Sequence, residues 1–190
     1  MSLRNHDGPA TLVRRRPGGD YTFSLAISPD GSTLASAGSG VRLQSIADLR
    51  VRHVLCRHML WFKTVAFSND SSMLATGGYD KKIMIFDVAT GGLQRVILQA
   101  DVVCAVTFSP DAMIVGDYRG KINVYELDSY AYSKNIRFKL ERGGLVSRVA
   151  VSPGGHLLAV VSGIVKWTKV ALFSSITGEL LRRGAVPSNP

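Results

Sequence analysis

The predicted turn Ser28-Pro29-Asp30 indicates the fold of this chain, because similar segments recur three times along the sequence. The later copies follow at intervals of 40, 41 and 43 residues: Ser68-Asn69-Asp70, Ser109-Pro110-Asp111 and Ser152-Pro153-Gly154. A period in the low forties, with short apolar runs in each unit, is typical of a radial β repeat rather than of one continuous core. The sequence therefore predicts an all-β repeat architecture.

Each unit is predicted to contain four strands. The first has apolar residues at alternate positions, as in Tyr21, Phe23, Leu25 and Ile27, and this period of two predicts a sheet with one buried face. The Ser-Pro-Asp turn then leads to a second and a third strand, for example 73–76 and 83–86. The fourth strands are basic and carry Arg50, Arg52, Arg57, Arg95, Arg137, Lys139, Arg142, Arg182 and Arg183.

These units divide the chain into a polar N-terminal arm, a repeat region and a short C-terminal tail. The predicted bounds are 1–10 for the arm, 11–184 for the repeats and 185–190 for the tail. Within the repeat region the units run approximately over 17–57, 58–98, 99–141 and 142–183. Ahead of the first unit, residues 11–16 resemble a fourth strand without a blade of its own.

Composition fits a folded domain and leaves the type of partner open. The chain has 190 residues, 46% of them hydrophobic and 19% charged, with a net charge of +9. That charge is compatible with an anionic partner or with a role in solubility alone. The two cysteines, Cys56 and Cys104, lie in apolar runs, and neither a leader peptide nor an apolar run of membrane-spanning length is present. We therefore expect no transmembrane segment and a location in the cytoplasm or nucleus.

No pattern of catalytic chemistry is visible. The four histidines form no metal-binding spacing, and there is no glycine-rich phosphate loop and no Gly-x-Ser-x-Gly elbow. The prediction is a protein that is not an enzyme, with no catalytic residues, no cofactor and no metal site.

With these strands and turns, the chain resembles the WD40 repeat family of β-propellers over nearly its whole length. The second unit is the best match: His58 lies where the family has its Gly-His pair, and Asp80 and Phe86-Asp87 lie at its structural aspartate and its Trp-Asp pair. The resemblance implies a structural network that includes His58, Thr76 and Asp80. In the third unit Tyr125-Glu126 replaces the Trp-Asp pair, Gln99 the histidine and Arg119 the aspartate.

The resemblance also raises the question of how the ring closes, since the family usually has seven or eight blades and this chain has four units. Three explanations stand: a fragment of a longer chain, a dimer that completes the ring, and four blades closed with the help of residues 11–16. The sequence favours an incomplete propeller, and self-association would cover its open blade edges.

Residues on one face of such a propeller are the predicted binding site. In the family, the loops between second and third strands, and those leading into first strands, share a face that commonly binds protein partners. The predicted function is accordingly a non-catalytic scaffold or adaptor that binds a protein or peptide in a multi-subunit complex. Aromatic and positively charged residues occur together at these positions, as is common in protein interfaces. The predicted binding residues are Trp61, Lys63, Tyr79, Tyr118, Arg119 and Trp167.

A second prediction uses the basic fourth strands, which lie at the circumference of a propeller. An anionic membrane lipid, including phosphoinositides, or a nucleic acid would then contact Arg14, Arg15, Arg16, Arg182 and Arg183. The segment Leu181-Arg182-Arg183-Gly184 is similar to the Arg-Arg-Gly element of the phosphoinositide-binding propellers of autophagy.

Overall fold

Sixteen strands form four separate antiparallel sheets in the computed structural model, which describes residues 22–38, 40–55, 62–127, 129, 132–137, 146–163 and 169–185. Each sheet consists of four strands that are consecutive in the chain, so every blade is a simple meander. Blade 1 contains β1 (Thr22–Ile27), β2 (Thr33–Gly38), β3 (Val41–Ser45) and β4 (Val51–Leu55). Blade 2 contains β5 (Phe62–Phe67), β6 (Met73–Gly78), β7 (Lys82–Asp87) and β8 (Leu93–Leu98).

The third and fourth blades repeat this order. Blade 3 contains β9 (Val103–Phe108), β10 (Ala112–Asp117), β11 (Lys121–Glu126) and β12 (Tyr132–Arg137). Blade 4 contains β13 (Val146–Val151), β14 (Leu157–Ser162), β15 (Lys169–Ser174) and β16 (Leu180–Ala185). The predicted all-β architecture of four four-stranded antiparallel blades is confirmed. The predicted extra strand at 11–16 lies outside the described residues.

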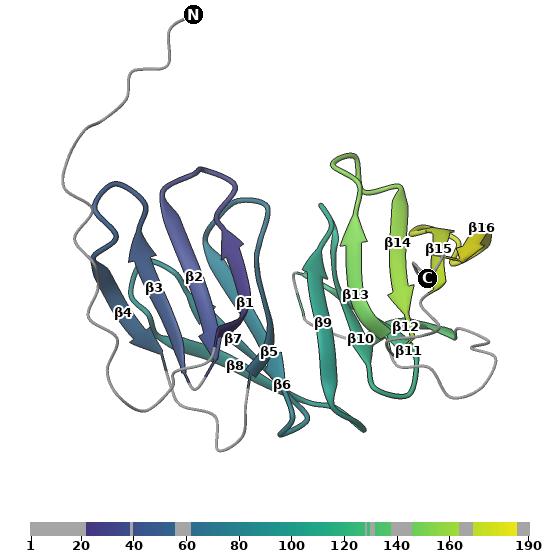
Figure 1. Cartoon of the computed structure of the whole chain (residues 1–190), viewed down its shortest axis with the longest axis horizontal. Helices are drawn as coiled ribbons and strands as arrows, with labels where there is room; N and C mark the ends of the chain where they lie inside the picture. The colour runs from purple at the N-terminus through teal and green to yellow at the C-terminus, as the bar shows by residue number, and fades with distance from the viewer. Residues whose placement is uncertain are drawn as a thin grey trace, which may run out of the picture.

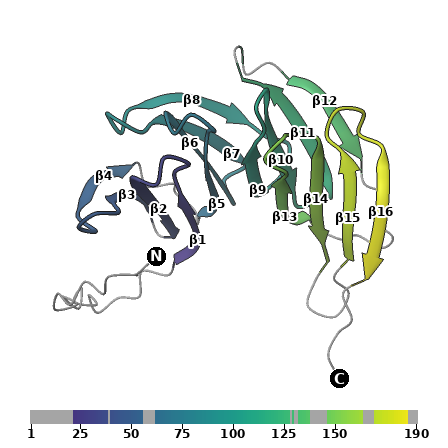
Figure 2. The ribbon, with the colours of Figure 1, turned by 90° about the horizontal axis from the view of Figure 1, so that it is seen from above.

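The four blades stand side by side in an open arc (Figures 1 and 2). The first strands β1, β5, β9 and β13 line its inner side and contact one another in succession, while β8, β12 and β16 lie on its outer side (Figure 2). Blades 1 and 4 stand at opposite ends of the arc (Figure 2). The described strands therefore do not form a closed four-bladed ring.

The recurring Ser-x-Asp segments are the tight turns between first and second strands. In blade 2 the Asp70 carboxylate accepts hydrogen bonds from the Ser68 hydroxyl and from the Ser72 N–H, and the Ser68 hydroxyl accepts one from the Met73 N–H. Blade 1 repeats this arrangement around Asp30. These bonds to the carboxylate lower the pKa of Asp70 below its usual value.

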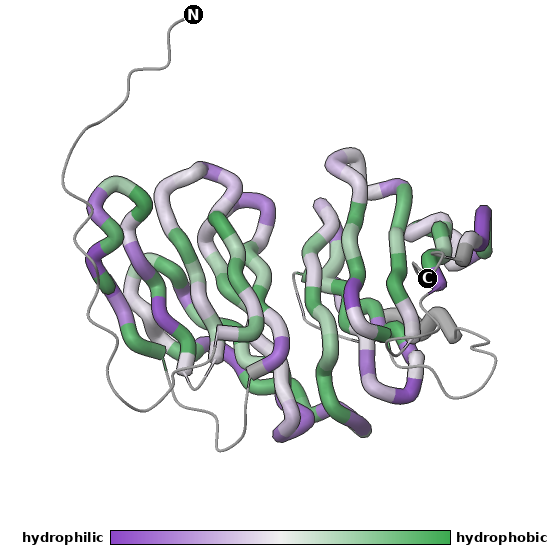
Figure 3. Tube along the Cα trace, in the orientation of Figure 1, coloured by the Kyte–Doolittle hydropathy of each residue, from purple (hydrophilic) through white to green (hydrophobic). Residues whose placement is uncertain are grey.

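The core is divided among the three junctions between blades. One cluster of buried side chains joins blades 1 and 2, a second joins blades 2 and 3, and a third joins blades 3 and 4. Figure 3 shows hydrophobic stretches along β9 and β14 and hydrophilic residues at many turns. In β9 the residues Val103 to Val106 are all buried, because an inner strand in the middle of the arc has a blade on each side.

This arrangement corrects the prediction that each first strand has one buried face. In blade 2 and blade 3 the inner strand is buried on both faces or nearly so. In blade 1, by contrast, the alternating apolar side chains of Phe23, Leu25 and Ile27 are 42%, 63% and 62% exposed. They are exposed because no blade precedes them within the described chain.

Hydroxyl groups tie neighbouring inner strands together. The Val65 N–H donates to the Ser24 hydroxyl oxygen at 3.2 Å, and the Val106 N–H donates to the Thr64 hydroxyl oxygen at 3.1 Å. Ser24 and Thr64 occupy the same place in successive blades, and the next residue in this series is Ala105, which has no hydroxyl. The junction between blades 3 and 4 therefore lacks this link.

Candidate protein-binding face

The predicted binding residues gather at one end of the sheets, which we call the Lys63 face. It is formed by Lys63 in β5, the β6–β7 turn with Tyr79, the segment 99–102, and the β10–β11 turn with Tyr118 and Arg119. Because strands alternate in direction within each blade, the Ser-x-Asp turns lie at the opposite end. The Lys63 face thus draws on blades 2 and 3 together.

Lys63 links the two predicted tyrosines. Its ammonium nitrogen lies 5.5 Å from the centroid of the Tyr79 ring and 5.8 Å from that of the Tyr118 ring. Both distances are within the range of a cation–π contact. The two rings are 46% and 47% exposed, so they are not buried in the junctions between blades. Three residues predicted from sequence therefore form one cluster.

Cys104 is the third neighbour of Lys63, and sequence reasoning did not assign it to the site. The Lys63 ammonium donates to the Cys104 sulfur at 3.3 Å, and the thiol donates to the Val102 carbonyl at 3.7 Å. Burial raises the pKa of this thiol, and the charge of Lys63 only partly opposes that effect. Because the thiol stays protonated at neutral pH, it does not neutralise the ammonium.

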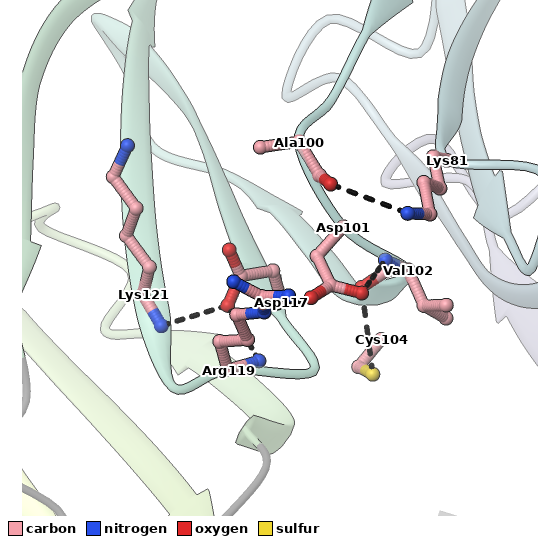
Figure 4. Close-up of polar contacts among 8 residues, drawn as sticks. All are labelled: Lys81, Ala100, Asp101, Val102, Cys104, Asp117, Arg119 and Lys121. Carbon is pink, nitrogen blue, oxygen red and sulfur yellow. Dashed lines mark hydrogen bonds and ion pairs between the residues drawn. The ribbon is translucent and has the colours of Figure 1, made fainter.

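The segment between blades 2 and 3 is held from both sides (Figure 4). Lys81 of blade 2 donates to the Ala100 carbonyl at 3.4 Å, and the Arg119 guanidinium of blade 3 pairs with the Asp101 carboxylate at 2.6 Å. The Tyr118 N–H also donates to the Val102 carbonyl at 3.0 Å. Arg119 therefore belongs to the face through an ion pair, and its side chain is 83% exposed.

In blade 3 a buried carboxylate shapes the turn that carries Tyr118 and Arg119. Asp117 accepts hydrogen bonds from the N–H groups of Arg119, at 2.9 Å, and Lys121, at 2.8 Å. Its side chain is only 4% exposed, and burial raises the pKa of this carboxyl above its usual value. Asp117 thus fixes the turn at which the resemblance places Arg119 instead of an aspartate.

The family network is altered in the third unit in a second way. The Tyr125 hydroxyl lies 2.7 Å from the amide nitrogen of Gln99 and 3.1 Å from its amide oxygen. Asn123 donates to that oxygen at 3.0 Å. Gln99 and Tyr125, the residues at the histidine and tryptophan positions, therefore bond to each other directly.

The structure describes all but one of the structural residues predicted in the second unit. The Thr76 hydroxyl donates to the Met84 carbonyl at 3.5 Å, and the Asp80 carboxylate accepts from the Lys82 N–H at 3.3 Å. Phe86 is buried in the core, and the Asp87 carboxylate accepts from the N–H of Thr90 at 2.7 Å. Their predicted partner His58 lies outside the described residues.

Several other predicted site residues also lie outside the described chain. They are Trp61, Trp167, Arg14, Arg15 and Arg16. Arg182 and Arg183 are described and exposed on β16, where they pair with Leu172 and Ala171 of β15. Successive residues of a strand point to opposite faces of the sheet, so these two arginines face opposite sides of blade 4.

Cys104 was recognisable from sequence only through the repeat. It occupies the position in β9 that Lys63 occupies in β5, 41 residues earlier. Residues at equal positions of adjacent inner strands lie side by side in a propeller, and the period was therefore the available signal. Asp101 lies in a connecting segment with no such signal.

Neither a membrane-spanning helix nor a metal-binding group of side chains is found in the part of the chain that the structure describes. No apolar helix of the length needed to span a bilayer occurs there. Nor do three or more histidine, cysteine, aspartate or glutamate side chains come together there as a metal-binding group.

The blades and their arrangement define the chain as a β-propeller structure, and its resemblance to WD40 repeats is confirmed by comparison with known proteins. The profile described as "WD domain, G-beta repeat" matches residues 50–87, which span the end of blade 1 and most of blade 2. Cilia- and flagella-associated protein 52 of Chlamydomonas reinhardtii is 26% identical over 173 residues, and these cover 87% of this chain. WD repeat-containing protein SL1-17 of Schistosoma mansoni is 42% identical over 77 residues, or 40% of this chain.

Small ribosomal subunit protein RACK1 of Medicago sativa is 26% identical over 97 residues, which cover 50% of this chain. The matched parts make up 26%, 25% and 30% of these three relatives, so the chain spans about a quarter to a third of their length.

Solved structures show the same fold at low sequence identity. Hydrazine synthase of Kuenenia stuttgartiensis matches with a TM-score of 0.79 at 17% identity, over 94% of this chain and 53% of that one. The WD40 repeats of RRP9 match with a TM-score of 0.69 at 17% identity, over 82% of this chain and 49% of that one. At such identities the likeness concerns the fold alone.

Proposed function

We propose that this chain is part of a non-catalytic WD40 scaffold that binds a protein or peptide partner through the Lys63 face. The observation that carries the proposal is the Lys63 ammonium, which contacts the exposed rings of Tyr79 and Tyr118. Rigid aromatic rings beside a positive charge are common anchors of protein interfaces, because they bury much area at little cost in entropy.

The charge of Lys63 suggests what the partner presents. Among the described residues no carboxylate lies within ion-pair distance of its ammonium group, and its nearest polar neighbour is the neutral thiol of Cys104. A partner carboxylate could therefore pair with the Lys63 ammonium, which is already positioned between the two tyrosine rings. Arg119, although paired with Asp101, would add attraction at longer range.

The relatives support a place in a larger assembly. One is named as a protein of the small ribosomal subunit and another as a protein associated with cilia and flagella. We extend from these names only the general role of a subunit within a multi-protein complex, in the cytoplasm or nucleus. Propeller folds host many functions, so the particular partner is to be found by experiment.

Selection of peptides from a random phage-displayed library on the immobilised chain tests the proposal. We expect the selected peptides to lose about 30-fold in affinity on the double substitution Tyr79→Ala with Tyr118→Ala, as when an interface anchor is removed. Lys63→Gln should weaken acidic peptides most. The control Arg182→Glu with Arg183→Glu should leave binding unchanged.

The same pair of variants tests the alternative of a basic outer belt. If the selected ligands instead depend on Arg182 and Arg183 and ignore both tyrosines, the Lys63 face is not the binding site. Binding of anionic vesicles or nucleic acid that is lost only in the arginine variant would support the alternative. No contact in the described residues favours it at present.

A further inference from the structure

A cavity of about 320 Å³ lies at the junction of blades 3 and 4, at the end of the sheets opposite the Lys63 face. The β9–β10 turn forms one wall with Pro110 and Asp111, and the β13–β14 turn forms another with Gly155 and His156. The buried side chains of Ile114 and Val124 line it with apolar surface. Its volume is at the lower end of the range for ligand pockets.

A shortened turn explains why the space exists at this junction. In blades 1 and 2 the serine N–H bonds to a carbonyl five residues on, from Ser28 to Thr33 and from Ser68 to Met73. In blade 3 the Ser109 N–H bonds to the Ala112 carbonyl, only three residues on. The turn of blade 3 is therefore two residues shorter than its equivalents.

Neighbouring turns also meet differently at this junction, because blade 4 has Gly155 at the position of Ser71 in blade 2. In blade 1 the Asp30 N–H donates to the Ser71 hydroxyl of the next blade at 3.1 Å. No hydrogen bond of this kind joins the corresponding turns of blades 3 and 4 in the described chain. They touch through packing instead, since a Cβ atom on Gly155 would lie only 2.7 Å from Cδ of Pro110.

Two carboxylates at the cavity differ from their equivalents in blade 2. Asp70 and Asp87 are occupied in holding turns: Asp70 accepts from Ser68 and Ser72, and Asp87 accepts from the N–H and hydroxyl of Thr90. Asp111 and Glu126 take the same places in blade 3, as the strand pairings Met73 with Asp87 and Ala112 with Glu126 show.

Both of these carboxylates are exposed at the cavity and make no hydrogen bond or ion pair within the described structure. For Asp111 the reason is direct, because the short turn omits the residue that would correspond to Ser72. The cavity thus combines an apolar lining with two uncompensated negative charges, in a chain whose net charge is +9.

We infer that this cavity binds a long cationic side chain, arginine or lysine, presented by a partner protein. The methylene stem of such a side chain packs against Ile114 and Val124 while its charged end reaches Asp111 and Glu126. An anionic ligand would be repelled by both carboxylates, and a purely apolar one would leave them desolvated without a counter-charge. This site is separate from the Lys63 face and does not depend on the function proposed for it.

Capped pentapeptides of sequence Gly-Gly-X-Gly-Gly test the inference, with X as arginine, lysine or the neutral arginine analogue citrulline. In a nitrogen-15 NMR titration of the full chain, we expect saturable shifts of the Ala112, Gly155 and Ser175 amide signals with the two cationic peptides. Citrulline should give none. Comparison of arginine with lysine then identifies the preferred cation.

Two variants distinguish a built site from general charge attraction. The double substitution Asp111→Asn with Glu126→Gln should weaken binding about fivefold or more, because two partly solvated ion pairs are lost. The matched control Glu179→Gln removes an exposed carboxylate outside the cavity and should have no effect. Equal binding of citrulline, or of the double variant, would overturn the inference.

The sharpest test restores the long turn. Insertion of Gly-Ser after Asp111 gives blade 3 the Ser-Pro-Asp-Gly-Ser pattern that blade 1 has at 28–32. The added residues should engage Asp111 and fill the cavity, so binding disappears while the circular dichroism spectrum and melting temperature are kept. Retained binding in a folded insertion variant would contradict the inference, as would an absence of saturable shifts in the parent chain. If the insertion unfolds the chain, the charge variants decide.

Discussion

At the scale of single residues, Asp117 shows how this chain keeps a family feature with a different residue. The resemblance put Arg119 at the position of the structural aspartate and gave no substitute for it. In the structure the carboxylate of Asp117, two residues earlier, accepts the N–H groups that shape the turn. The turn is preserved because its geometry needs an acceptor in reach, and two positions can supply one.

The buried carboxylate leads to a pH prediction for Asp117→Asn. Burial raises the folded-state pKa of Asp117 above the usual value of 3.8, so the folded state binds its proton more readily than the unfolded state does. The contribution of this group to stability is therefore greatest at low pH and falls as pH rises from about 3.8 through the folded pKa. The asparagine variant lacks this dependence.

Chemical denaturation at a series of pH values checks this expectation. The free energy of unfolding of the parent chain, relative to that of Asp117→Asn, should decrease as pH rises from acid to neutral. The comparison with the variant matters because Asp70 and Asp87 have lowered pKa values and change the absolute curve in the opposite direction. A difference that stays constant or increases with pH would show that Asp117 is not destabilised by burial.

At the scale of elements, the second strand of a blade packs against the first strand of the next through glycine. Gly77 of β6 and Gly116 of β10 occupy equivalent positions and lie against Val103 and Val146 respectively. A Cβ atom on Gly116 would lie 2.5 Å from the Cγ1 atom of Val146, which is itself fully buried. The spacing of neighbouring blades at this point thus depends on the missing side chain.

We expect Gly116→Ala to destabilise the fold by about 1–3 kcal/mol, because the added methyl group overpacks the junction of blades 3 and 4. Gly40→Ala is the control, since nothing lies within 4 Å of its Cβ position, and its effect should stay within about 0.5 kcal/mol. Denaturant unfolding measures both. The double variant Gly116→Ala with Val146→Ala should recover part of the loss, and a harmless Gly116→Ala would refute the tight contact.

At the scale of the whole molecule, the open arc leaves one sheet face of blade 1, the face at the end of the arc, without a neighbouring blade. The apolar side chains of Leu25, Ile27 and Val54 are 63%, 62% and 65% exposed there. In a longer propeller such a face packs against another blade, and the relatives with which this chain aligns are longer than it is. In the isolated chain a second copy would provide that cover.

We therefore expect self-association of the isolated chain, measured as a mass above 20.5 kDa that increases with concentration in light scattering. The double substitution Leu25→Lys with Ile27→Lys should restore the monomer mass, because two charges on this face oppose its burial. Leu93→Lys with Leu98→Lys adds the same charge on the exposed outer strand β8 and should not. A monomer at every concentration would refute the expectation.

The sequence was sufficient to predict the number of blades, their strands and the turns that join them. These are local properties: a period near forty, an alternation of two within strands, and Ser-x-Asp turns whose bonds span only a few residues. Through the family resemblance it also predicted Lys63, Tyr79 and Tyr118 on one face, because the loops between second and third strands and those leading into first strands share a face in that family.

The packing of one blade against the next sets which of these residues touch and which faces remain open. The contact of Lys63 with Cys104 and the free carboxylates of Asp111 and Glu126 depend on how one blade sits against the next. Leu25 and Ile27 are exposed because no neighbouring blade covers them. The alternation of residues within a strand cannot predict whether such a neighbour is present. Packing between repeats is a long-range property, and a local pattern fixes each blade without fixing its surroundings.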